Sequence, residues 1–299
     1  MKLKKAIAEQ VIVITGASSG IGLATAQLAA GLGARVVLAA RSEDTLDGIC
    51  AEINANGGTA IGVCADVADR AQVDRVVETA IGQFGRIDTW VNNAGVSMYG
   101  RLEEVSEADS RRLFDTNFWG VVNGSLAALP HLRQSGGALI NVGSEVSEAV
   151  VPLQGMYSAS KHAVKGFTDA LRVEVEDVDA AAVSITLILP TAVDTPFPQH
   201  AKNYMDREPK LPTPQIAPEE VAIAIVDAAR TPVRSVKVGG MATINTLAAK
   251  LAPALADKLS ARQVDRQHYD EPPRNPDGGL WHAAAEGLVH GTGGYESAR

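Results

Sequence analysis

The chain has 299 residues, 46% of them hydrophobic, and carries a formal net charge of −8. Its basic residues are spread along the chain, which argues against the basic patch of a nucleic-acid-binding protein. No apolar run approaches the ~18 residues of a membrane span, and the N-terminus lacks the apolar stretch of a signal peptide, so a cytoplasmic location is expected. The histidines and cysteines show no metal-ligand spacing, and no metal is expected.

The first predicted strand, Val11–Ile14, is a continuous apolar run, as in strands buried on both faces. A turn of small residues follows, and then a predicted helix. Free backbone N–H groups and the positive end of the helix meet at this turn, which predicts an anion site for a pyrophosphate. The candidate cofactor-binding residues here are Gly16, Ser18, Ser19, Gly20, Ile21 and Gly22.

The same turn also satisfies a rival motif. Gly16-Ala17-Ser18-Ser19-Gly20 matches G-x-S-x-G, the nucleophile elbow of α/β-hydrolases. That elbow usually lies on a mid-sheet strand and needs an acid and then a histidine downstream. The hydrolase is therefore the last of the alternatives.

Apolar strands alternate with helical segments along the rest of the chain. Further strands are predicted at 35–40, 60–64, 87–91, 138–142, 183–189 and 235–238, and helices start at 43 and cover 71–84, 106–132, 154–178 and 218–230. This alternation implies right-handed crossovers and predicts an α/β fold, a doubly wound Rossmann-type sheet of about seven parallel strands with helices on both faces. Residues 1–240 are expected to form one dinucleotide-binding and catalytic domain.

Two further segments follow this domain. Residues 241–262 have leucines near helical spacing, which predicts one amphipathic C-terminal helix. Residues 263–299 are rich in proline and glycine and predict an irregular tail. Its aromatic residues Tyr269, Trp281 and Tyr295 indicate that parts of it dock on a surface, either a lid or a neighbouring subunit.

The end of the second strand predicts which cofactor is used. An acidic residue there would bind the 2′-hydroxyl of NAD, but this strand ends Ala39-Ala40-Arg41-Ser42. The Arg41 guanidinium suits a 2′-phosphate because it donates two parallel hydrogen bonds and stays charged, and Ser42 offers a hydroxyl in addition to capping the next helix. The sequence therefore predicts NADP(H).

A second motif suggests proton transfer. Tyr157 and Lys161 are four residues apart in a predicted helix, so they share one face. A free tyrosine has a pKa near 10, and a nearby ammonium lowers that pKa toward the range of a useful acid or base. Ser144 follows a strand at the carboxyl edge of the sheet, where its hydroxyl can hold a substrate oxygen beside Tyr157.

Together these motifs resemble the short-chain dehydrogenase/reductase family. T-G-x-x-x-G-x-G, Asn-Asn-Ala-Gly, Asn117, Ser144 and Tyr157-x-x-x-Lys161 occur in the family's order over about Gln10 to Pro196. The resemblance implies a catalytic tetrad of Asn117, Ser144, Tyr157 and Lys161, with Asn117 tethering Lys161 through water. Tyr157 and Lys161 are implied to touch the cofactor as well.

The resemblance also implies further cofactor contacts. Asp66 and Val67 match positions that touch adenine, Asn93, Ala94 and Gly95 match a loop against the adenosine ribose, and Val193 and Thr195 match positions that face the nicotinamide carboxamide. The family often has Pro-Gly where this chain has Pro190-Thr191, and a β-branched residue does not readily adopt a positive φ. A homodimer or homotetramer is implied.

The predicted function is an NADP(H)-dependent oxidoreductase that transfers a hydride between nicotinamide and a secondary alcohol or ketone. The alternatives are a 3-oxoacyl-type reductase on carrier-bound substrate and a regulator that binds NADP without turnover. The substrate is expected between residues 97–99, 145–156 and a lid at 197–215. An apolar wall there would include Val146, Val150, Val151, Leu153 and Met156, although ordinary packing explains these residues equally well.

Overall fold

The computed structural model describes residues 5–283 and 287–291. Seven parallel strands form its main sheet in the order β3-β2-β1-β4-β6-β7-β9. Their bounds are β1 (Val11–Thr15), β2 (Arg35–Ala40), β3 (Thr59–Cys64), β4 (Thr89–Asn92), β6 (Ala138–Val142), β7 (Ser184–Pro190) and β9 (Ser235–Val238). The predicted doubly wound parallel sheet is confirmed.

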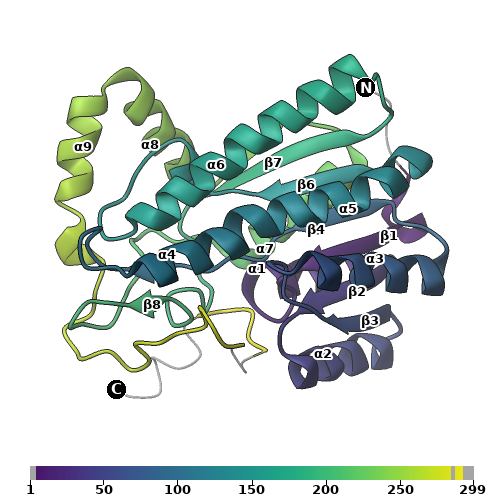
Figure 1. Cartoon of the computed structure of the whole chain (residues 1–299), viewed down its shortest axis with the longest axis horizontal. Helices are drawn as coiled ribbons and strands as arrows, with labels where there is room; N and C mark the ends of the chain where they lie inside the picture. Colours follow the sequence, from purple (N-terminus) through teal and green to yellow (C-terminus); the bar gives the residue numbers. More distant parts are fainter. Residues whose placement is uncertain (1–4, 284–286, 292–299) are drawn as a thin grey trace.

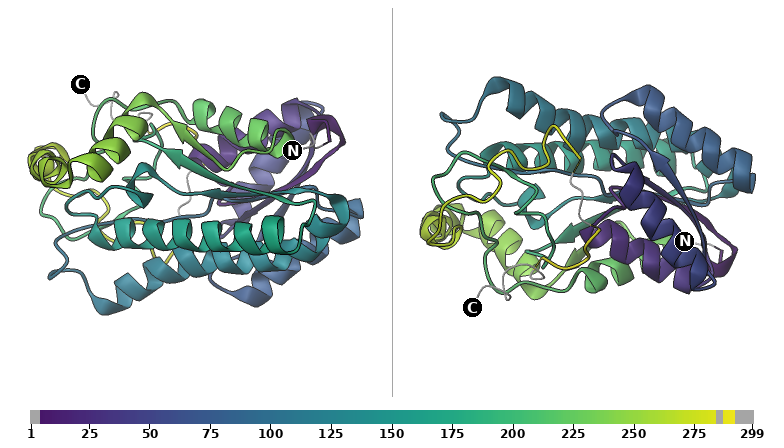
Figure 2. Two further views of the ribbon diagram at one scale, coloured as in Figure 1. Left: turned by 90° about the horizontal axis from the view of Figure 1, so that it is seen from above. Right: turned by 90° about the horizontal axis from the view of Figure 1, so that it is seen from below.

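Helices cover both faces of this sheet (Figures 1 and 2). One face carries α1 (Gly20–Gly31), α2 (Glu43–Ala55) and α7 (Pro218–Arg230), and the other carries α3 (Arg70–Phe84), α5 (Gly120–Ser135) and α6 (Gly155–Arg172). Ile12 and Ile14 of β1 belong to the first core, whereas Val11 and Val13 belong to the second. Because successive side chains point to opposite faces, the continuous apolar run fills both cores.

Two of the predicted long helices contain π-helical turns, one inside the segment and one at its end. The segment predicted at 106–132 consists of α4 (Glu107–Phe114), the π-turn η2 (Asp115–Trp119) and α5. The segment predicted at 154–178 consists of α6 and the π-turn η4 (Val173–Val178). Such single turns are frequent at functional sites, and η2 carries Asn117.

The strand order reverses at β1, which has β2 on one side and β4 on the other. In open parallel sheets, ligands bind in the crevice that such a reversal opens at the carboxyl ends of the strands. Shorter elements surround this edge: η1 (Ile7–Glu9), η3 (Glu145–Ser147), η5 (Val264–Arg266), and a two-stranded sheet of β5 (Met98–Tyr99) and β8 (Lys202–Asn203).

The C-terminal region contains two helices where the sequence predicts one. They are α8 (Gly240–Leu251) and α9 (Pro253–Ala261), separated by Ala252 in a non-helical conformation (φ −142°, ψ 61°). The ring of Pro253 disfavours a helical conformation at Ala252, and proline itself is well accepted as the first residue of the next helix.

The irregular tail that follows runs back over the molecule beneath β8 (Figure 1). Its Leu280 side chain is fully buried, and the Pro276 carbonyl accepts a hydrogen bond from the Asn203 N–H at 2.8 Å. The predicted docking of the tail thus occurs on its own chain, whereas Tyr295 lies outside the described residues. None of the helices within 5–283 and 287–291 has the length and apolar character required to cross a membrane.

Candidate active site

One cavity lies at the carboxyl edge of the sheet and collects most of the predicted site residues. Its lining includes Gly16, Ser18, Ser19, Gly20, Ile21, Arg41, Ser42, Asp66, Val67, Asn93, Ala94, Gly95, Ser144, Tyr157, Lys161, Val193 and Thr195. Gly22 and Asn117 lie outside that lining. Residues from six different strand ends thus meet in one place, as the sheet topology requires.

Glycines in the turn after β1 let neighbouring backbone segments lie close together. Gly16 and Gly20 have positive φ values of 64° and 52°, which favour glycine. A Cβ on Gly22 would lie 2.2 Å from the Gly16 carbonyl oxygen, so this residue packs α1 against the turn without lining the cavity. Ser19 is the N-cap of α1, yet its side chain makes no capping hydrogen bond. Ser19 lines the cavity, and its hydroxyl is not used to cap the helix.

The chain's own tail reaches this helix start. The N–H of Gly20 donates to the carbonyl of Leu288 at 2.9 Å. Val289 packs against the core that contains α1. Leu288 is one of the tail residues expected to dock on a surface, but its partner was not predictable because this hydrogen bond joins backbone groups only.

The tail also reaches Arg41. Its guanidinium donates through Nη1 to the Leu280 carbonyl at 3.1 Å and through Nη2 to the Gly279 carbonyl. Burial lowers the pKa of Arg41, and the nearby Arg112 lowers it further, whereas Asp66 raises it. Ser42 is the N-cap of α2, as predicted, but its hydroxyl bonds to Thr45 Oγ1 at 2.7 Å and makes no side-chain capping hydrogen bond to the helix backbone.

Asp66, predicted to touch adenine, forms an ion pair that the sequence did not indicate. Its carboxylate accepts from Arg112 Nη2 at 2.5 Å and from the Ala68 N–H at 3.0 Å. The Arg112 side chain comes from α4 and is only 11% exposed. Since Arg112 stands on a polar helix with no motif around it, sequence reasoning had no signal for placing it here.

The Asn-Asn-Ala-Gly loop is fixed to the end of β1. The Asn93 side-chain amide donates to the carbonyls of Thr15 and Gly16 at 3.0 and 3.1 Å. The Thr15 hydroxyl accepts from the N–H groups of Asn93 and Ala94. These bonds hold the loop against the glycine turn, which keeps both walls of the cavity close together.

The Tyr-x-x-x-Lys pair lies on α6, and both side chains line the cavity. Burial raises the pKa of Tyr157 to about 12; a hydrogen bond with the Ser144 side chain lowers it, and the charge of Glu145 raises it. Burial also lowers the pKa of Lys161 to about 8. In the chain alone, removing the phenol from water dominates the pKa of Tyr157, and the expected lowering of that pKa by Lys161 stays a prediction.

Asn117 connects the π-turn to the neighbouring loop. Its side-chain Oδ1 accepts from the Val96 N–H at 2.8 Å, and its Nδ2 donates to the Val96 carbonyl at 2.9 Å and to Ser160 Oγ at 3.0 Å. The Lys161 ammonium donates to the Val142 carbonyl at 2.9 Å. Asn117 thus contacts the helix of Lys161 one residue before it, and the predicted water-mediated tether stays a prediction.

The part of the cavity beside Tyr157 is mostly apolar. Val146, Val150 and Val151 line it, as predicted, with further apolar residues from α8 and α9. Leu153 and Met156 do not, and Met156 instead packs in a cluster with Leu113 and Leu280. The predicted Ser97–Tyr99 wall is also absent from the lining, since Met98 and Tyr99 are fully buried in β5.

Glu145 is an acidic residue in the lining of this cavity. Glu145 accepts hydrogen bonds from Thr191 Oγ1 at 3.1 Å and Asn245 Nδ2 at 3.0 Å, and burial raises its pKa. Thr191 adopts no positive φ, and its N–H donates to the Val238 carbonyl at 3.0 Å. The threonine at the usual glycine position is therefore accommodated, and its hydroxyl links the end of β7 to the residue after Ser144.

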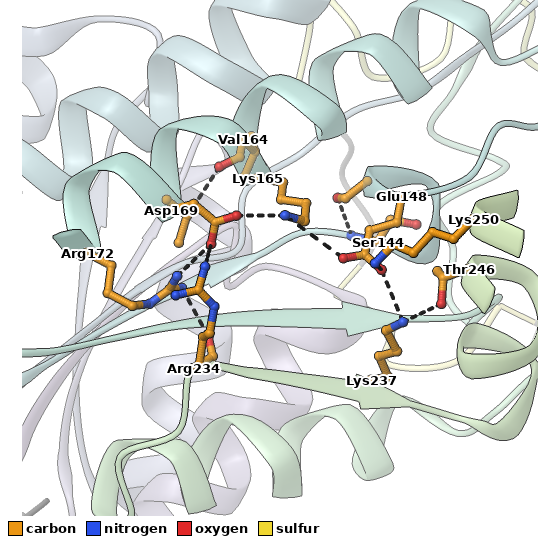
Figure 3. A network of polar contacts seen from close by, with 12 residues as sticks. Ser144, Glu148, Val164, Lys165, Asp169, Arg172, Arg234, Lys237, Thr246 and Lys250 are labelled. Carbon is orange, nitrogen blue, oxygen red and sulfur yellow. Dashed lines mark hydrogen bonds and ion pairs between the residues drawn. The ribbon is translucent and has the colours of Figure 1, made fainter.

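A charged network holds α8 against the loop that carries Ser144 (Figure 3). The Glu148 carboxylate lies 3.1 Å from the ammonium groups of Lys237 and Lys250, and Lys165 lies 4.0 Å away. Burial raises the pKa of Glu148, but the hydrogen bonds and charges of these two lysines outweigh it and keep the pKa below its ordinary value. Lys165 extends the network to Asp169, which also pairs with Arg172 and Arg234.

Comparison with known proteins identifies the family. Residues 10–205 match the family described as short chain dehydrogenase. The chain is a short-chain dehydrogenase/reductase. This range contains the glycine turn and the Tyr157–Lys161 pair, so the chain is an oxidoreductase of this family.

Two relatives are similar over most of the chain. The uncharacterized oxidoreductase YxnA of Bacillus subtilis is 46% identical over 279 residues, which are 92% of this chain and 78% of YxnA. An 11-beta-hydroxysteroid dehydrogenase A of Sesamum indicum is 38% identical over 195 residues, 64% of this chain and 55% of that protein.

Two solved structures that resemble this chain are complexes with nicotinamide dinucleotides. A Burkholderia phymatum short-chain dehydrogenase/reductase in complex with NAD is 27% identical, with a TM-score of 0.72 over 90% of this chain and 99% of that one. An alcohol dehydrogenase from Thermococcus sibiricus, complexed with 5-hydroxy-NADP, is 29% identical, with a TM-score of 0.67 over 77% and 95% of the two chains. The neighbours include both dinucleotide types, so they do not select between NAD and NADP.

Proposed function

We propose that this short-chain dehydrogenase/reductase uses NADP(H) to interconvert a secondary alcohol and a ketone, with Tyr157 as the acid/base. The observation that carries the proposal is the content of one cavity. Its lining contains both the glycine turn with Arg41 and the Ser144, Tyr157 and Lys161 side chains.

The donor set fits an NADP-type dinucleotide. The start of α1 offers N–H groups and the Ser19 hydroxyl for the pyrophosphate. Arg41 stands where an acidic residue would select the unphosphorylated ribose, and its planar fork suits a phosphate. Asp66, Val67 and the Asn93–Gly95 loop would enclose the adenosine, and Val193 and Thr195 would face the carboxamide.

The chemistry of the site follows from Tyr157. When bound, the nicotinamide supplies or takes the hydride. With a pKa of about 12, the Tyr157 phenol is protonated at neutral pH and can donate its proton to a carbonyl oxygen as the adjacent carbon is reduced. The Ser144 hydroxyl, which is hydrogen-bonded to Tyr157, holds the same oxygen. Lys161, with a pKa of about 8, can supply a replacement proton from the same face of the helix.

The apolar wall of Val146, Val150 and Val151 favours a ketone with apolar substituents. A panel of apolar and charged ketones, followed by loss of NADPH absorbance with NADH as the comparison, tests the proposal. Turnover of the apolar ketones with NADPH at a higher kcat/KM than with NADH is expected. Tight NADPH binding without turnover on any ketone or alcohol would support the sensing regulator instead.

A further inference from the structure

Two arginines from distant parts of the chain converge on one carbonyl oxygen. Arg41 follows β2 and donates through Nη1 to the Leu280 carbonyl at 3.1 Å, and Arg112 on α4 donates to the same oxygen through Nε at 3.2 Å. The second guanidinium nitrogen of Arg41 donates to the adjacent carbonyl of Gly279. Two like charges therefore share a neutral acceptor.

Neutral carbonyls are a poor match for this pair. Burial and the proximity of Arg112 both lower the pKa of Arg41, which shows that its charge is costly where it lies. Asp66 offsets one of the two positive charges through its ion pair with Arg112. The group of three keeps a net positive charge, and an anion with several oxygens would satisfy both guanidinium forks better than a backbone carbonyl.

The tail also occupies the second anion-binding point of the cavity. The Leu288 carbonyl accepts from the Gly20 N–H at the start of α1. The tail thus places carbonyl oxygens at the guanidinium groups of Arg41 and Arg112 and at the N-terminus of α1. These are the two places where the proposed dinucleotide would bring phosphate oxygens.

We propose that Arg112 joins Arg41 in binding the 2′-phosphate of the dinucleotide, and that the Gly279 and Leu280 carbonyls hold both guanidinium groups until the phosphate displaces them. This rests on the proposed use of NADP(H). Arg112 is then a second specificity-determining residue, and residues 278–283 move when a 2′-phosphorylated nucleotide binds.

Calorimetric titration with adenosine 2′,5′-bisphosphate and with 5′-AMP tests the role of Arg112, because the two probes differ only in the 2′-phosphate. The wild-type chain is expected to prefer the bisphosphate, and Arg41→Gln and Arg112→Gln are each expected to reduce that preference by about tenfold or more. Arg111→Gln is the matched control, since Arg111 is the adjacent residue on α4 and is 75% exposed. It should behave like the wild type.

A purely structural role for Arg112 predicts a different pattern. If Arg112 only positions Asp66, its loss weakens the binding of both probes equally and leaves the ratio of their affinities unchanged. That result overturns the proposal. The double variant Asp66→Asn/Arg112→Gln removes the carboxylate that Arg112→Gln leaves unpaired. In this double variant the ratio of affinity for the bisphosphate to affinity for 5′-AMP should stay low. A wild-type chain without preference for the bisphosphate refutes NADP(H) use itself, whereas loss of preference in Arg41→Gln alone refutes only the role of Arg112.

Amide hydrogen exchange on the full chain tests the tail. Saturation with the bisphosphate should speed exchange in residues 278–283, where the Gly279 N–H donates to the His200 carbonyl at 2.7 Å. Saturation with 5′-AMP should change it much less. Equal exchange with both probes would show that the tail carbonyls are not displaced by the 2′-phosphate.

Discussion

Lys161 lies one helical turn from Tyr157 on α6, with its ammonium nitrogen 5.7 Å from the centre of the Tyr157 ring. The same ammonium donates to the Val142 carbonyl at 2.9 Å. The two side chains are thus held in one buried site in which the phenol has a raised pKa and the ammonium a lowered one. Burial acts on both groups in the direction of the neutral form.

Replacing Tyr157 with phenylalanine removes the proposed proton donor and keeps the ring. We expect kcat to fall by about 10²–10⁴ with NADPH and an active ketone, because general acid–base groups contribute that much. The dissociation constant for NADPH, measured by fluorescence, should stay within a few-fold of wild type. Tyr204→Phe is the control, since its hydroxyl bonds to Asp109 away from the cavity lining. Turnover by Tyr157→Phe at the level of this control would contradict the role.

Replacing Lys161 with methionine should change how stability depends on pH. In the folded chain the pKa of Lys161 falls from 10.5 to about 8, so the unfolded chain binds more protons between these values. The free energy of unfolding of the wild type should therefore rise with pH in this window, by up to about 3 kcal/mol relative to Lys161→Met.

Urea unfolding between about pH 7 and 10 measures this difference. Tyr157, whose pKa is 10.0 when the chain is unfolded, is present in both proteins, so its titration cancels in the comparison. Lys258→Met is the control, because Lys258 is exposed on α9. The free energy of unfolding of Lys258→Met should change with pH as that of the wild type does. If the unfolding free energy of Lys161→Met also changes with pH as that of the wild type does, the Lys161 ammonium is not as buried as the structure describes.

Two glycine-to-alanine changes should have opposite effects on stability. At Gly22, a Cβ would lie 2.2 Å from the Gly16 carbonyl oxygen and 2.6 Å from Asn93 Nδ2, so we expect a loss of about 1–3 kcal/mol or more. At Gly82, inside α3, a Cβ would meet no atom within 4 Å, and we expect a gain of about 0.5–1 kcal/mol. Thermal unfolding compares the two, and equal effects would contradict the packing of α1 on the turn.

Replacing Glu148 with glutamine should loosen α8. The change leaves Lys237 and Lys250 without their carboxylate, and we expect a loss of about 1–3 kcal/mol in unfolding free energy and a higher KM, because α8 lines the substrate part of the cavity. Glu107→Gln breaks an exposed pair with Arg111 and should cost less than about 1 kcal/mol. An unchanged KM in Glu148→Gln would show that the charged network around Glu148 does not influence the substrate site.

The sheet was predictable because each strand is recognisable from its own run of apolar residues. The apolar run of β1 fills two cores at once, and such runs occur at regular intervals. The site at the carboxyl edge followed from topology, since Arg41, Ser144 and Tyr157 all stand at strand ends or on the helix after them.

The rest depended on contacts that leave no pattern in the chain. The carbonyls of Leu280 and Leu288 act through the backbone, so their side chains do not reveal their partners. Arg112 is placed by a tertiary ion pair with Asp66. The break at Ala252 was signalled by Pro253, but the leucine spacing on both sides of it favoured one continuous helix.

The bond between the Gly20 N–H and the Leu288 carbonyl joins residues at opposite ends of the sequence. During translation, the first strands leave the ribosome long before residue 288 does. The nascent chain can therefore pair its early strands, but the start of α1 acquires this acceptor only after residue 288 has been synthesised. A ribosome-bound fragment that ends before residue 278 would lack the tail carbonyls that accept from the Gly20 N–H and the Arg41 guanidinium in the released protein.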